Sequence, residues 1–159
     1  VRNFVHNLAF PIRFLNCLLQ GKPKEAGVEM GRFIINSTVG MAGLIDVAKK
    51  DKPIVEPDKE DFGQTLGAWG AGEGFYIVWP VIGPSTLRDS VGLAGDYLAD
   101  PFSYMVDDNL LYMGGRAYGE FNKADEAIAG YEAVTKSAVE PYTSMRNAYI
   151  QMRRAKVTK

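Results

Sequence analysis

Few residues of this chain could carry out covalent chemistry. It has one histidine, His6, and one serine with a suggestive setting, Ser85, which follows a proline in the segment GPSTL. A serine hydrolase places its nucleophile on a G-x-S-x-G turn, with a base within hydrogen-bond reach. Ser85 lacks that turn, and His6 is far away in the sequence. Helix capping explains Ser85 without any partner, so we predict that the protein is not an enzyme.

The sequence offers no set of metal ligands. Its one cysteine, Cys17, cannot form an internal disulfide, and with His6 it supplies only half of a structural zinc site. Cys17 lies in a helical apolar pattern, which predicts a small core residue. The acidic groups at 58–61 and 107–108 lack the spacing and the glycine of a calcium loop. We predict no metal and no cofactor.

The most unusual segment is residues 61–89, DFGQTLGAWGAGEGFYIVWPVIGPSTLRD, which contains six glycines and two prolines. That density breaks regular helix. The stretch WGAGEG at 69–74 lacks the Lys-Ser/Thr of a phosphate loop, and Glu73 would oppose a bound anion. The apolar run from Phe75 to Gly83 must instead be buried in a core or set against lipid.

Most of the remaining chain shows helical periodicity. We expect helices over 1–20 with an interruption at Pro11, and over 22–38, 44–50, 85–99, 106–120, 123–136 and 140–155. The charged segment 51–61 reads as a surface loop, and 75–79 is the one strand-like candidate. The predicted fold is therefore all-α, with a single domain over 1–159.

Two helices carry a stripe of apolar side chains, and the stripe of the last helix fits the pattern of a face that points toward the core. Both stripes follow helical spacing, and they comprise Ala26, Met30, Phe33 and Ile34 in the helix over 22–38, and Tyr142, Met145, Tyr149 and Met152 in the last helix.

Three groups of basic residues have more than one interpretation. Arg32 and Arg88 stand among apolar neighbours, so each should bond a carboxylate or loop carbonyls, face a wet path and touch lipid head groups, or be exposed. The basic segment from Arg146 to Lys159 is either a solvated helix end or a contact for anionic lipid or an acidic partner.

The global composition narrows the class of partner. A formal net charge of -1 gives no reason to expect nucleic-acid binding. No apolar run approaches the ~18–20 residues that a membrane-spanning helix needs. The net charge and the short apolar runs are compatible with a protein that lies within one leaflet of a membrane without spanning it.

Four ordered blocks give the chain a family resemblance. They are NFVHNLAFP at 3–11, NCLLQGKPKEAG at 16–27, GRFIINSTVGMAGLIDVA at 31–48 and the segment at 61–89, with a weaker match, PYTSMRNAYIQMR, at 141–153. In these blocks the sequence resembles the MlaA (VacJ) family of outer-membrane lipoproteins. Members of that family begin with a signal peptide, a lipidated cysteine and a further segment, so the lipid anchor is inferred from the family.

The resemblance implies a ring-like arrangement of amphipathic helices lying in the plane of the outer membrane, in its periplasmic leaflet. Family members associate with trimeric porins, remove mislocalised phospholipid from the outer leaflet and pass it to a soluble periplasmic carrier. This transport maintains lipid asymmetry, and no bond is made or broken.

Combining the resemblance with the residues gives two sets of candidate site residues. The candidate lipid path or channel wall comprises Arg32, Asn36, Gly70, Gly72, Gly74 and Arg88. The candidate membrane-facing residues are Phe75, Tyr76, Ile77, Val78, Trp79, Val81 and Ile82. We expect residues 61–84 to form part of the channel wall and its gate, with glycines as hinges.

Two other functions compete with lipid transport. A membrane-peripheral scaffold would bind porin or partner proteins without conducting lipid. A lipid hydrolase would deplete the same pool by cleavage, and the missing triad argues against it.

Overall fold

Helices make up most of the described structure. The computed structural model describes residues 2–49, 57–80, 82–100, 103–104, 114, 124–136 and 138–158. The elements in these ranges are α1 Arg2–Leu8, α2 Phe10–Leu19, α3 Pro23–Thr38, α4 Phe62–Ala68, β1 Tyr76–Trp79, β2 Gly83–Thr86, α5 Leu87–Ala99, α8 Ala124–Thr135 and α9 Pro141–Val157. The mainly helical prediction is confirmed. None of the helices in these ranges is long and apolar enough to cross a membrane.

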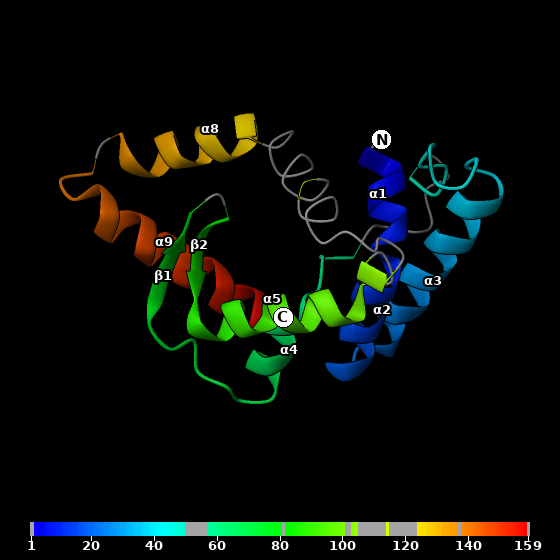
Figure 1. The fold of residues 1–159 in the computed structure, drawn as a ribbon, viewed down its shortest axis with the longest axis horizontal. Helices are drawn as coiled ribbons and strands as arrows, with labels where there is room; N and C mark the ends of the chain where they lie inside the picture. The colour runs from blue at the N-terminus through cyan, green and yellow to red at the C-terminus, as the bar shows by residue number, and fades with distance from the viewer. Residues whose placement is uncertain are drawn as a thin grey trace.

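The described elements follow an open arc (Figure 1). Helices α1, α2 and α3 stand together at one end, α4 and α5 lie along the middle, and the hairpin β1–β2 and α9 lead to α8 at the other end. The ring-like arrangement stays a prediction, because most residues between α5 and α8 lie outside the described ranges. That gap includes the helix expected over 106–120.

Several helices begin at the residues that the local sequence predicted. Pro11, Pro23 and Pro141 each occupy the first turn of a helix, where a missing N–H costs nothing. The side chain of Thr86 accepts the N–H of Asp89 and caps α5, as the spacing predicted. Asp61 caps α4 in the same way, by accepting the N–H of Gln64 at 2.9 Å.

The helix predicted from residue 44 is wrong. Residues 39–49 form turns, in which Met41 and Ala42 have positive φ angles of 52° and 58°. The backbone turns back so tightly that a Cβ at Gly40 would lie 2.3 Å from the carbonyl oxygen of Ile45. A segment folded this closely on itself cannot continue as a helix.

The sequence also missed a strand. β1 pairs antiparallel with β2, in a register that places Tyr76 opposite Thr86 and Trp79 opposite Gly83. The β2 sequence, GPST, contains a glycine and a proline, which weaken any strand signal. Pro84 is tolerated because the two-stranded sheet leaves an unpaired edge.

Glycines allow α4 and α5 to touch through their backbones. A Cβ at Gly92 would lie 2.4 Å from the backbone nitrogen of Gly63. Close approach through small residues is the usual packing of helices in membranes, where no hydrophobic force drives them together. This crossing brings the polar side chains of both helices within reach of α9.

Candidate functional site

The polarity of the molecule is inverted relative to a water-soluble domain. Among the described residues, five apolar side chains are buried, against sixteen that are polar or charged. The buried apolar residues are Phe10, Ile12, Cys17, Ala26 and Ala48. In a soluble protein of this size the interior is mainly apolar and buried charges are rare. The interior here is held together by hydrogen bonds and ion pairs instead.

Large apolar side chains lie mostly on the outside, and each apolar stripe is only partly covered: Ala26 is buried, and Phe33, Met145 and Tyr149 are half-buried. On α3, Met30 is 37% and Ile34 is 52% exposed, whereas the buried face carries Glu29, Arg32 and Asn36. On α9, Tyr142 and Met152 are exposed, and Arg153 is the buried residue. Helical periodicity locates an apolar face correctly but does not say whether protein or lipid covers it.

A cluster around Arg153 joins three helices, and we call it the Arg153 cluster. It consists of Arg153 on α9, Asp61 at the start of α4, Asp89 and Arg88 on α5, and Tyr149 on α9. Arg153 donates to both carboxylate oxygens of Asp61, at 2.7 and 2.8 Å, and to both of Asp89, at 2.8 Å each. Tyr149 donates to Asp89 at 2.9 Å, and Arg88 donates to it twice at 3.1 Å. Two arginines thus balance two aspartates.

The charges in this cluster are fixed. Burial alone would raise the pKa of Asp61, but hydrogen bonds and the charge of Arg153 outweigh it and lower that pKa. The pKa of Asp89 is lowered against burial in the same way, with help from Tyr149. Burial and the Asp89 carboxylate raise the pKa of Tyr149, so its hydroxyl stays protonated as a donor. The arrangement is therefore a structural clamp between the three helices.

A second polar contact joins α2 to α4 and α5. Asn16 donates to Asp96 at 3.0 Å and accepts from Thr65 at 2.7 Å. The same oxygen of Asp96 accepts the backbone N–H of Phe62 at 3.0 Å. Together with the Arg153 cluster, this contact links four helices through buried polar atoms.

The structure separates the candidate path residues. Arg32 and Asn36 both donate to Asp46, at 3.0 to 3.2 Å and 3.0 Å, whereas Arg88 belongs to the Arg153 cluster. Each arginine therefore bonds a carboxylate, which is one of the alternatives that the sequence left open. The cavity beside Arg32 and Asn36 has a volume of about 20 Å³. It has room for about one water molecule and none for a lipid head group in this conformation.

The loop between α4 and β1, which we call the glycine loop (residues 69–75), holds the other path candidates. Gly70 and Gly74 have φ angles of 94° and 68°, which strongly favour glycine. A Cβ at Gly74 would also lie 2.9 Å from that of Leu87, whereas one at Gly72 would meet no atom within 4 Å. The backbone conformation of the loop therefore favours glycine at Gly70 and Gly74, whereas a side chain at Gly72 would meet no neighbouring atom.

A groove that the sequence did not predict lies between the glycine loop, β1 and α9. Its volume is about 520 Å³, and its walls are Gly74, Phe75, Tyr76, Tyr142, Arg146, Asn147, Ile150, Gln151 and Arg154. Pockets of 300–1,000 Å³ commonly bind small molecules. The basic residues of the C-terminal segment were visible in the sequence. Their position opposite β1 depends on the hairpin, which the sequence did not predict.

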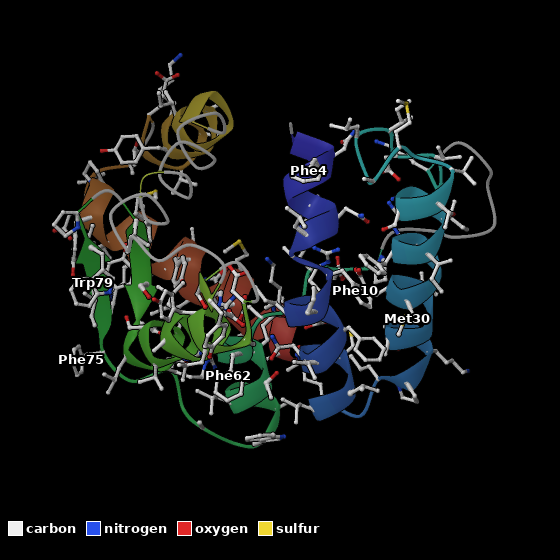
Figure 2. All side chains as sticks on the ribbon, turned by 45° about the vertical axis from the view of Figure 1, so that its right-hand side comes forward. Phe4, Phe10, Met30, Phe62, Phe75 and Trp79 are labelled. Atoms are coloured by element: carbon white, nitrogen blue, oxygen red, sulfur yellow. The ribbon has the colours of Figure 1, made fainter. Side chains whose placement is uncertain are left out.

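The hairpin carries the candidate membrane-facing residues. Phe75, Val78, Trp79 and Ile82 are exposed, Tyr76 and Ile77 are half-buried, and Val81 lies outside the described residues. Figure 2 shows Phe75 and Trp79 on the outer side of the hairpin. Contact between these residues and lipid stays a prediction.

The residues first considered for covalent chemistry have structural surroundings. Helix capping does not explain Ser85, because the N-cap of α5 is Thr86; the Ser85 hydroxyl instead lies 3.1 Å from that of Ser90 and donates to the carbonyl oxygen of Thr86 at 3.3 Å. Cys17 is fully buried, and burial with the nearby Glu60 and Glu29 raises its pKa to about 11. A thiol in that state is inert at neutral pH, and the prediction of a core cysteine is confirmed.

Comparison with protein families gives one match over nearly the whole chain. Residues 1–156 match the model of a family described as MlaA lipoprotein. A solved chain, from work on the structural basis for maintenance of bacterial outer membrane lipid asymmetry, superposes with a TM-score of 0.78. It is 31% identical, and the match covers 98% of this chain and 77% of that one.

Individual relatives agree with the family model. The intermembrane phospholipid transport system lipoprotein MlaA of Haemophilus influenzae is 32% identical over 161 residues, which cover 96% of this chain and 60% of that protein. The protein of the same name from Escherichia coli K12 is 32% identical, over 94% of this chain and 59% of its own length. An uncharacterized protein of Rickettsia bellii is also 32% identical, over 99% of this chain and 61% of its own length. The chain thus spans 59 to 61% of the length of these relatives.

Replacing Arg153 tests the central clamp. Arg153→Gln leaves Asp61 and Asp89 without their main partner, and breaking a buried ion pair in this way costs about 3–5 kcal/mol of unfolding free energy. Denaturant unfolding of the detergent-solubilised protein measures the loss. The neighbouring exposed Arg154, which pairs with Glu73, provides the control, and Arg154→Gln should leave the unfolding midpoint unchanged.

The pH dependence has a definite sign. Because Arg153 lowers the folded-state pKa of both aspartates, its contribution is fully present above their unfolded pKa, at about 4. That contribution is lost as the pH falls through the lower folded values. The gap between wild type and Arg153→Gln should therefore shrink below pH ~4. Equal effects of the two substitutions, or a gap independent of pH, would contradict the clamp.

Proposed function

Because this chain belongs to the MlaA lipoprotein family, we propose that it is the body of an outer-membrane component that removes mislocalised phospholipid from the outer leaflet. It passes this phospholipid to a soluble periplasmic carrier and so maintains lipid asymmetry. Residues 1–159 act as one domain in this proposal. The activity is inferred for the whole protein, because the chain spans 59 to 61% of the relatives compared.

The observation that carries the proposal is the inverted polarity. Exposed apolar side chains are distributed over α2, α3, the hairpin and α5, and 25 large ones are exposed among the described residues, whereas Phe10 and Ile12 are the large apolar side chains buried there. In water such a surface would drive aggregation. When lipid tails cover this apolar surface, its exposure carries no free-energy penalty. The buried polar contacts then supply the attraction between the helices. The molecule is thus suited to lie within a leaflet.

Polar interiors also suit the cargo. A phospholipid that moves between membranes needs polar groups for its head group beside apolar groups for its acyl chains. Non-helical backbone such as the glycine loop is tolerated at membrane depth where protein buries it or water lines it. These features support transport of an intact lipid, with no bond made or broken.

The expected partners follow from the family. We propose that the protein sits in the outer membrane beside a trimeric porin, held in the periplasmic leaflet by a lipid anchor. A scaffold that binds the same partners without conducting lipid is distinguished from this proposal by lipid movement itself.

The direct test is phospholipid in the outer leaflet. The chain is expressed behind a lipoprotein signal and the family's N-terminal segment, in a Gram-negative strain that lacks its own family member. Surface-accessible phospholipid should fall to the level of the parent strain. A persistent excess, with the protein confirmed in the outer membrane, would contradict transport and favour the scaffold.

The same assay tests whether the glycine loop moves during transport. Gly74→Val introduces strain at a positive φ and a contact with Leu87, and should slow lipid removal. Gly72→Val meets no atom within 4 Å, so it should leave the fold intact and slow transport only by stiffening the loop.

Gly27 on α3, which is equally open, provides the control. Gly27→Val should support wild-type lipid removal. Normal transport by a well-expressed Gly72→Val protein would show that the loop acts through its static shape and would refute the hinge.

A further inference from the structure

The groove between β1 and α9 carries an uncompensated positive charge. Arg146, Ile150 and Arg154 follow one another at intervals of four residues, so they share the face of α9 that lines the groove. Arg154 is neutralised, because it forms an ion pair with Glu73 of the glycine loop. Arg146 has no carboxylate within ion-pair distance in the described part of the chain. Its one side-chain contact there is a long one, 3.5 Å to Asn147.

The groove surrounds that charge with further donors and an apolar wall. The side-chain amides of Asn147 and Gln151 lie on the same side, and both can donate hydrogen bonds. Opposite them, Tyr76 packs edge-on against Tyr142, with ring centroids 5.8 Å apart. A single unpaired cation beside amide donors and aromatic carbon is complementary to a group with one negative charge and an apolar attachment.

The exposed surface next to the groove indicates which such group it is. Phe75 forms part of the groove wall and is 64% exposed, and the exposed Val78 lies two residues beyond Tyr76 on the same face of β1, so it extends the apolar surface next to the groove. Acyl chains could lie on this surface while a phosphate occupies the groove. Inorganic phosphate has no apolar part that would use it.

We propose that this groove binds the phosphodiester of a phospholipid head group, with Arg146 as the anchoring cation. The Glu73–Arg154 pair limits the groove to one net positive charge, which matches the single negative charge of a phosphodiester. The inference rests on the proposed function, since it assigns a head-group site to the lipid that is transported.

Calorimetric titration of the purified full chain with dihexanoyl phosphatidylglycerol below its micellar concentration tests the site. Arg146→Gln removes a charge-assisted contact, so binding should weaken about ten-fold. Lys156→Gln removes one positive charge from the same helix outside the groove, and should bind within about two-fold of wild type, as expected for a screened charge.

Two further ligands test the chemistry without any variant. Dihexanoylglycerol, which lacks the phosphate, should bind much more weakly than the phospholipid. Inorganic phosphate, which lacks the acyl chains, should also bind more weakly. The proposal is overturned if the wild type does not bind the phospholipid, if either of these ligands binds as tightly, or if the two substitutions weaken binding equally.

The outcome is separable from that of the proposed function. Phospholipid binding that is unchanged by Arg146→Gln, in a protein that restores outer-leaflet asymmetry, would refute the site alone. Binding through Arg146 in a protein that fails to restore asymmetry would refute the transport alone.

Discussion

The structure depends on the bonds that Arg153 makes to two aspartates. One guanidinium binds Asp61 at the start of α4 and Asp89 in the first turn of α5, so a single side chain of α9 fixes where three helices meet. Both carboxylates also lie near helix N-termini, where the helix dipole favours negative charge. The hairpin packs between α5 and α9, so the position of the groove follows from the same cluster.

This clamp explains how the molecule can do without an apolar core. Helices that expose apolar side chains to lipid gain nothing by burying them against each other. Polar pairs and close glycine contacts then hold the helices together, as they do where Gly92 meets Gly63 and where Asn16 meets Asp96. The buried contacts between these helices are therefore mainly polar.

Local features were predictable from the sequence, and long-range ones were not. Helix starts at Pro23 and Pro141 and the cap at Thr86 depend on neighbouring residues, so the structure confirms them. Which face of a helix other protein covers depends on its surroundings, and Tyr142 and Met152 of the stripe predicted to face the core are exposed. The role of Arg153 was invisible, because its partners lie 64 and 92 residues away in the sequence.

The central claim is that the exposed apolar side chains lie in lipid, and accessibility of attached spin labels tests it most directly. Single cysteines at Ile34 and Leu98 carry nitroxide labels in the membrane-reconstituted protein, with exposed Lys49 as the polar reference. The native Cys17 is fully buried and should resist labelling. The account predicts that labels at Ile34 and Leu98 are reached by oxygen dissolved in the bilayer and shielded from a water-soluble nickel reagent. Accessibility to nickel equal to that at Lys49 would contradict it.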